Sequence, residues 1–243
     1  MTAKLNAQAI ILDTETHTLN GLPIEIAYAP VALHQGKLIL DQGQIFDQYY
    51  QVNEKISYGA MAVHHILESD LVNQPHYSTF RLPEETQYII GHNIDYDIQA
   101  IARCGVDTSQ LKAICTLALA RHVWPDFDSH NISALIYRLS NGSEQARQML
   151  KNAHRADADI LLTANIVMHL LHAIQQHTPI HSMQDLFEFS QQARIPSVMP
   201  FGKHKGTPLK DLPTDYVQWL VENKQDLDPH LKQALQPYLT NAV

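Results

Sequence analysis

The N-terminal part of the chain alternates short apolar runs with turn residues, which is typical of β-strands. AIILD (9–13) is an apolar run that ends in an acid, as expected of a buried central strand. IEIAYAPVAL (24–33) predicts a second strand and HQGK (34–37) a hairpin turn, while LILDQGQIFDQYYQV (38–52) predicts one or two further strands. We therefore expect an antiparallel meander at the start of the domain.

Helical periodicity dominates farther along the chain, although residues 55–71 are ambiguous. Apolar residues recur at helical spacing in four segments, 95–105, 117–124, 130–142 and 155–177. Short β-type runs precede the first two of them, at 87–91 and 111–116. The last helix is the strongest, because its apolar positions sustain the 3.6-residue period over several turns. Strands combined with helices in this way predict an α/β domain.

A change of composition follows the long helix and divides the chain. We expect one domain over residues 1–176, a linker with a short helix over 177–199, and a small helical module over 200–243. The module contains MPFGKHKGTPLKDLP and then a helix-like DYVQWLVENK, which is predicted to bury Tyr216, Trp219 and Leu220.

Composition indicates a globular protein of a reducing compartment. The hydrophobic share of 45% in 243 residues is enough for a core. The two cysteines, Cys104 and Cys115, have no metal-ligand spacing and are expected to be small core residues. The N-terminus lacks the apolar core of a signal peptide, and no uninterrupted apolar run is long enough to span a bilayer. We expect a cytoplasmic protein with no membrane partner.

The formal net charge of −8 argues against a tight binder of nucleic acid, because phosphate contacts depend on lysine and arginine. Bound divalent cations would change this balance if several of the acids faced them. An enzyme that processes nucleic acid also needs only a local basic rim. The charge lowers the expectation of a nucleic-acid substrate without excluding it.

Four acids in three separated motifs are the strongest chemical signal. Asp13 and Glu15 in DTET share one face of a strand, because side chains alternate with a period of two. Asp97 in HNIDYD lies in the first turn of a predicted helix, and Asp159 in HRADAD lies near the start of the long one. The D-x-E pair alone is a weak signal, because two acids at this spacing more often lie on an exposed strand. All three motifs in this order predict carboxylates that converge on divalent metal.

His154 precedes Asp159 by five residues. On a continuous helix these positions would diverge by roughly 140°. We therefore expect His154 in the loop before the helix, from which its imidazole can reach the metal site. An imidazole is suited to accept a proton near neutral pH, as the attack of water on a phosphodiester requires.

The set DTET, HNIDYD and HRADAD resembles the three motifs of the DEDDh branch of the DnaQ-like 3′–5′ exonucleases, over roughly residues 9 to 176. The resemblance implies an RNase H-like fold, a mixed five-stranded sheet flanked by helices. It also implies that Asp13, Glu15, Asp97 and Asp159 bind two ions of Mg²⁺ or Mn²⁺, and that His154 is the general base.

The same resemblance suggests residues that contact substrate. The backbone of Thr14 and Glu15 would hold the terminal 3′-hydroxyl, and His64 in AMAVHHIL would lie near the scissile end. Asn93 would contact the site or fix the turn into its helix. In the C-terminal module, Lys203 and Lys205 would contact DNA phosphate beside the cleft, or else form part of a solvated glycine turn.

The expected activity is hydrolysis of DNA from 3′ ends to 5′-mononucleotides, because the FGKHKG tail resembles one bacterial branch of exodeoxyribonucleases. The DNA would be single-stranded, with duplex DNA as a further candidate. Two alternatives stay open: a 3′–5′ exoribonuclease of the RNase T or oligoribonuclease type, and a nucleic-acid-binding protein without catalysis. The oligomeric state is open as well, with a homodimer among the alternatives.

Overall fold

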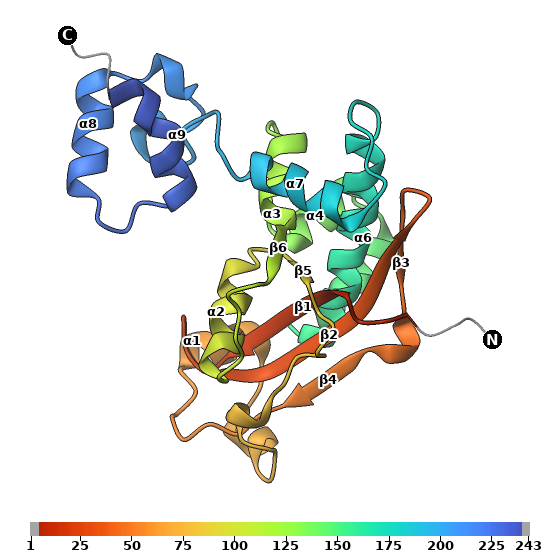
Figure 1. Ribbon diagram of the computed structural model, residues 1–243. Coiled ribbons are helices and arrows are strands. Elements are labelled where there is room, and N and C mark those ends of the chain that lie inside the picture. Colours follow the sequence, from red (N-terminus) through yellow and green to blue (C-terminus); the bar gives the residue numbers. More distant parts are fainter. Residues whose placement is uncertain (1–4, 240–243) are drawn as a thin grey trace. The chain divides into compact units, whose positions relative to one another are not determined.

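The structure is a computed structural model that describes residues 5–239 (Figure 1). Residues 1–4 and 240–243, which the predicted domains include, lie outside the described part. The chain forms two compact units, and the boundary between them in the sequence lies between Ser190 and Gln191.

The first unit is built on a mixed β-sheet. Its strands are β1 (Ala9–Thr16), β2 (Pro23–His34), β3 (Lys37–Leu40), β4 (Phe46–Tyr49), β5 (Tyr88–Gly91) and β6 (Lys112–Cys115). The strand order is β3-β2-β1-β5-β6, and β4 also pairs with β2. β1 is antiparallel to β2 and parallel to β5, while β5 and β6 are parallel. The predicted meander and the mixed sheet are therefore confirmed.

The sheet has six strands among the described residues, whereas five were expected. The difference arises at β2, which is 12 residues long. Its first half, Glu25 to Tyr28, pairs with β4, and its second half, Val31 to His34, pairs with β3. Two short strands thus share one edge of β2, and the path across the sheet still has five positions.

The first unit has helices in all four segments predicted from periodicity, and a further helix, α5, that was not predicted. Its helices are α1 (Tyr58–His64), α2 (Asp95–Arg103), α3 (Thr116–Val123), α4 (Ile132–Leu139), α5 (Glu144–Met149) and α6 (Ala156–Ile174). The predicted short helix of the linker, α7 (Met183–Ala193), begins in this unit and runs past its boundary. The ambiguous segment contains α1. Ser57 is its N-cap, and the Ser57 hydroxyl accepts a hydrogen bond of 3.2 Å from the Ala60 N–H. α1 ends at His65, whose φ of 60° is left-handed.

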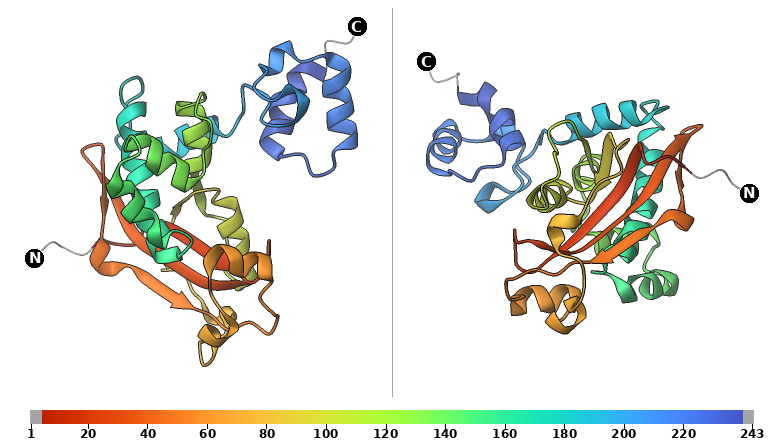
Figure 2. Two further views of the ribbon diagram at one scale, coloured as in Figure 1. Left: turned by 180° about the vertical axis from the view of Figure 1, so that it is seen from behind. Right: turned by 60° about the horizontal axis from the view of Figure 1, so that its bottom comes forward.

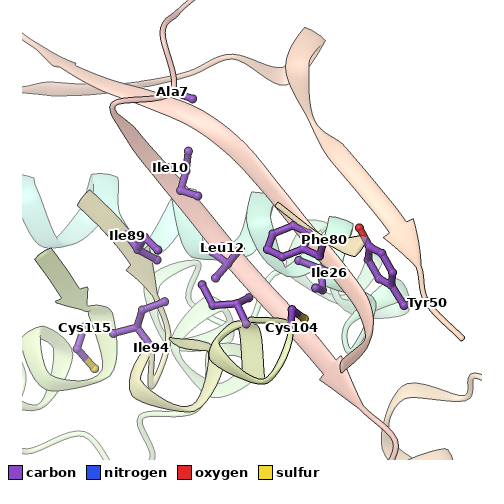
Figure 3. Close-up of a cluster of buried hydrophobic side chains, with 11 residues drawn as sticks. Ala7, Ile10, Leu12, Ile26, Tyr50, Phe80, Ile89, Ile94, Cys104 and Cys115 are labelled. Atoms are coloured by element: carbon purple, nitrogen blue, oxygen red, sulfur yellow. The ribbon is translucent and has the colours of Figure 1, made fainter. Parts of the chain in front are cut away.

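The core lies on both faces of β1. Ile10 and Leu12 pack with Ile101 of α2 in one buried cluster (Figure 3). The next residues in the alternation, Ile11 and Asp13, face the other side, where α6 packs against β1 and β2 (Figure 2). One face of β1 is thus covered by α2, which carries Asp97, and the other by α6, which carries Asp159.

α6 is, among the described residues, the one helix long and apolar enough to cross a membrane, yet 56% of that stretch is buried inside the protein. Its hydropathy follows from its place in the core. Cys104 and Cys115 are buried free thiols, as expected of core residues.

The second unit consists of short 3₁₀ turns, α8 (Thr214–Asn223) and α9 (Pro229–Leu239), and it has a hydrophobic cluster of its own. Leu220 is buried, as predicted, and Tyr216 is partly buried. The prediction for Trp219 is wrong, because 57% of this residue is exposed. Val217 and Leu220 face the core of the unit, and Trp219 lies about 100° around the helix from Leu220. The predicted boundaries of the domain, the linker and the module, after residues 176 and 199, stay a prediction.

Candidate active site

Asp13 and Glu15 leave the same face of β1 near its C-terminal end. In the ladder with β2, Asp13 lies opposite Ala27 and Glu15 opposite Glu25. The parallel ladder with β5 ends earlier, at Ile11. β1 therefore extends beyond its neighbour, and the edge that follows Ile11 is open to groups from other elements.

Asp97 reaches this edge from the first turn of α2. Its carboxylate is buried, and Oδ1 accepts a hydrogen bond of 2.8 Å from the Thr14 hydroxyl. The hydroxyl fixes the orientation of the carboxylate, which places the second motif beside the first. Thr14 thus contributes a side-chain contact that sequence reasoning did not predict.

The third motif adds Asp159 and His154. Asp159 lies in the first turn of α6, and its Oδ2 accepts a hydrogen bond of 3.3 Å from the His154 N–H. His154 has a left-handed φ of 68° and precedes the helix, which confirms the predicted loop position. Ligand atoms of Glu15, His154 and Asp159 all lie within 4.8 Å of one another. The first and third motifs therefore converge.

The carboxyl groups of the site are difficult to ionise together. Burial, followed by repulsion from neighbouring acids, raises the pKa of Asp13 well above its usual range and that of Glu15 to about 8. Burial also raises the pKa of Asp97 to about 7 and that of Asp159 to about 6, although hydrogen bonds from Thr14 and His154 oppose these shifts. Ionising all of these carboxyl groups costs free energy unless a cation compensates their charge.

The donor set fits a divalent metal. Asp159 Oδ1 is buried and has no hydrogen-bond partner, which leaves a carboxylate oxygen available for coordination. The other candidate ligands are also carboxylate oxygens, the donors that Mg²⁺ and Mn²⁺ prefer. The site can therefore hold hard divalent cations, and the nearby imidazole of His154 can move a proton.

An ion pair between the buried Glu25 and the partly exposed Arg155 holds the segment that carries His154. Glu25 of β2 is fully buried and accepts hydrogen bonds from Arg155 Nε at 3.0 Å and from the Ala156 N–H at 3.2 Å. Arg155 also lies 4.0 Å from Asp47 and above the Tyr49 ring. The start of α6 is thereby tied to β2 directly beside the site.

Sequence reasoning missed both Glu25 and Arg155. The available signal was an acid inside an otherwise apolar strand, because such a residue is seldom buried without a partner. Glu25 also forms an acidic cluster with Asp47 and Asp157, whose atoms lie within 4.8 Å of one another. Arg155 already supplies positive charge to this cluster, so it is not a second candidate metal site.

His64 is buried at the end of α1. Its Nδ1 accepts a hydrogen bond of 2.9 Å from the Ile66 N–H, whereas the buried Nε2 has no hydrogen-bond partner. Burial, with repulsion from His65 and His154, lowers the pKa of His64, so the imidazole is neutral at pH 7. The start of α1 is tied to the end of β1, because the Ser57 N–H donates a hydrogen bond of 2.8 Å to the His17 carbonyl.

Asn93 takes the turn role. It is exposed, has a left-handed φ of 66°, and its carbonyl accepts a hydrogen bond of 2.9 Å from the Tyr96 N–H. Lys203 and Lys205 belong to the second unit, where Lys203 Nζ lies 5.2 Å above the centre of the Tyr216 ring.

Comparisons with known proteins agree with this arrangement. Residues 10–167 match a family described as Exonuclease, and residues 191–228 match one described as Putative quorum-sensing-regulated virulence factor. Exodeoxyribonuclease 10 of Escherichia coli K12 is 25% identical over 236 residues, which cover 95% of this chain and 98% of that protein. The 3′-5′ exonuclease DinG of Staphylococcus haemolyticus is 26% identical over 57% of this chain and 15% of its own length.

Two solved structures share the fold. Exonuclease X in complex with 5′ overhanging duplex DNA has a TM-score of 0.52 at 24% identity, over 74% of this chain and 99% of that one. E. coli Exonuclease I in complex with a dA16 oligonucleotide has a TM-score of 0.51 at 18% identity, over 78% of this chain and 46% of that one.

The raised pKa values predict how stability depends on pH without metal. Glu15, Asp97 and Asp159 have folded-state pKa values of about 8, 7 and 6, above the values of roughly 4 in an unfolded chain. The folded state then binds more protons in this window, so these groups reduce stability progressively as pH rises from about 4 to about 8. Urea unfolding in EDTA at pH 5 to 8 measures the effect.

The variant Asp97→Asn isolates the contribution, since the half-buried His92, whose pKa is lowered to about 4, acts in the opposite direction. We expect Asp97→Asn to gain stability relative to wild type as pH rises, and Mg²⁺ to stabilise wild type more at pH 8 than at pH 5. Asp95→Asn, an exposed position in the same turn, is the matched control. A constant difference between wild type and Asp97→Asn across this range would contradict the expectation.

Proposed function

The chain belongs to the exonuclease family, and on that premise we propose that it hydrolyses DNA from 3′ ends and releases 5′-mononucleotides. The observation that carries the proposal is the convergence of three motifs at the end of β1, where Glu15, His154 and Asp159 approach within 4.8 Å. Asp97 joins them through its hydrogen bond to Thr14. All five expected catalytic side chains are present in the sequence.

Asp13, Glu15, Asp97 and Asp159 would hold two divalent ions, Mg²⁺ or Mn²⁺. When bound, the ions activate the attacking water and stabilise the charge that develops on the leaving 3′-oxygen. The protein supplies the fixed carboxylates. Thr14 orients Asp97, the His154 N–H orients Asp159, and Asp159 Oδ1 has no competing hydrogen-bond partner.

His154 is the proposed general base. Its position before α6 leaves the side chain exposed, so the imidazole can approach a water molecule and pass the proton to solvent. Its backbone is held on both sides, by Asp159 through the N–H and by Glu25 through Arg155 and Ala156. Glu25 and Arg155 are therefore positioning residues for the base.

The 3′ end of the substrate would lie along the open edge of β1. The pairing of β1 with β5 ends at Ile11, which leaves Thr14 and Glu15 beyond it. The backbone of these two residues is proposed to contact the terminal 3′-hydroxyl. His64, neutral and buried beside the site, would contact the terminal nucleotide through Nε2, which has no hydrogen-bond partner. Asn93 would contribute through the turn that positions Asp97.

We propose DNA as the substrate because a relative that resembles this chain over almost its whole length, tail included, is an exodeoxyribonuclease. The two related solved structures were determined with DNA oligonucleotides, one of them a duplex with a 5′ overhang. We propose single-stranded DNA, and duplex DNA with an accessible 3′ end, as substrates. Lys203 and Lys205 are proposed to contact the phosphates, and a homodimer remains a prediction.

The activity is tested with 3′-labelled single-stranded DNA, duplex DNA and RNA of the same sequence in the presence of Mg²⁺. We expect wild type to release labelled 5′-mononucleotide from DNA. Asp13→Ala should lower kcat/KM by about 1,000-fold, since a metal supplies several kcal/mol of transition-state stabilisation. Equal activity of Asp13→Ala would refute the metal site, whereas a strong preference for RNA would keep the mechanism and reject the substrate.

The positioning role of Glu25 is tested by Glu25→Gln. Glutamine keeps the shape but loses the charge that pairs with Arg155, so the segment carrying His154 should lose its fixed geometry. We expect kcat to fall by about 10-fold or more, with KM nearly unchanged, because small displacements of a catalytic group are costly. Asp47→Asn, whose carboxylate lies 4.0 Å from Arg155 and is partly exposed, is the control and should stay within about threefold of wild type. A lower unfolding temperature with unchanged kcat would assign Glu25 a structural role alone.

A further inference from the structure

A row of aromatic rings with a lysine above it lies on the surface of the second unit. The ring centres of His204 and Tyr216 are 4.4 Å apart, and those of Tyr216 and Trp219 are 6.2 Å apart with 24° between their planes. Lys203 Nζ lies 5.2 Å above the Tyr216 ring. We call these four residues, together with the exposed Lys205, the aromatic–lysine surface.

Trp219 is the unusual member, because 57% of it is exposed. Isolated apolar residues on a surface are normal. Trp219, however, is held against Tyr216, which is itself flanked by His204 and Lys203, so the indole belongs to an ordered cluster. An exposed ring that is already ordered loses little conformational freedom when a flat ligand stacks on it.

The charges around the surface favour an anionic ligand. The segment from Phe201 to Lys210 carries three lysines and no acid, in a chain whose net charge is −8. α8 carries two acids, Asp215 and Glu222, which keep their charge but accept hydrogen bonds from the Tyr216 N–H at 2.8 Å and from Gln218 Nε2 at 2.9 Å. Lysines combined with an accessible aromatic ring match a ligand that has both phosphates and flat bases.

We propose that the aromatic–lysine surface binds single-stranded DNA, with Trp219 stacking on an unpaired base and Lys203 and Lys205 contacting the phosphates. Bases in a duplex are stacked on one another and leave no free face for Trp219, whereas those of a single strand do. The second unit would thus select unpaired DNA, while the catalytic site acts on the 3′ end. The inference rests on the proposed function for its choice of DNA as the ligand.

The test uses the full chain in EDTA, where hydrolysis is prevented, with three probes of equal length: oligo(dT), an abasic oligomer and a blunt duplex. Trp219→Ala should raise the Kd for oligo(dT) by about fivefold or more, because stacking on one aromatic ring contributes at least this much to binding. It should leave the Kd for the abasic oligomer and the duplex unchanged. Trp219→Phe should restore most of the affinity, and Gln218→Ala, on the same helix, should have no effect.

Fluorescence gives an independent measurement, since the chain has two tryptophans. In a Trp124→Phe background, emission comes from Trp219, and oligo(dT) should quench it while the abasic oligomer should not. Lys203→Gln should weaken binding of oligo(dT) and the abasic oligomer alike and reduce the salt dependence. Because Trp219 is exposed, Trp219→Ala should keep the urea midpoint of wild type.

Any of three results would overturn the inference: an unchanged Kd for oligo(dT) in Trp219→Ala, an equal loss of affinity for the abasic oligomer, or an absence of quenching by oligo(dT). The last result would favour a protein partner as the ligand of the exposed ring. Hydrolysis is assayed separately with Mg²⁺. A wild-type protein that degrades no DNA would reject the proposed function, while the binding measurements in EDTA would still decide the role of the surface.

Discussion

The first unit has to hold several carboxylates together in a place where their charges repel and burial removes part of their hydration. Burial is the largest cause of the raised pKa values at Asp13, Glu15, Asp97 and Asp159, and mutual repulsion adds to it. The rest of the unit positions these groups despite that cost. Two helices cover opposite faces of β1, and each presents one carboxylate from its first turn. A bound divalent cation would compensate this repulsion and make the same cluster a binding site.

The ion pair between Glu25 and Arg155 fixes the position of the segment that carries His154. It joins residues 130 positions apart in the sequence and ties β2 to the start of α6. The pair contributes little to stability, because Glu25 loses its hydration on burial while solvent screens the partly exposed Arg155. Its effect is geometric: it fixes the direction in which the chain enters α6 and thereby sets His154 near Glu15. The chemistry of the site therefore depends on a contact that contains no catalytic residue.

Much of the site could be predicted from sequence because it depends on local patterns. The strand period placed Asp13 and Glu15 on one face, and the five-residue spacing placed His154 before the helix. The contacts of Thr14 and Glu25 could not be predicted in this way, since each partner comes from a distant element. Trp219 was misplaced because an apolar residue in an amphipathic helix is normally assigned to the buried face, and hydrophobicity does not reveal which side faces the core.

Calorimetric titration of Mn²⁺ into the metal-free protein at pH 7.5 tests whether the carboxylates form a two-metal site. Two ions should bind per chain. Metal binding should also release protons, because carboxyl groups with pKa values of about 7 and 8 are partly protonated before binding. Titrations in buffers of different ionisation enthalpy measure this release. Asp159→Asn should reduce the stoichiometry or the affinity. A wild-type protein that binds no Mn²⁺, or binds it without proton release and with unchanged affinity in Asp159→Asn, would contradict the account.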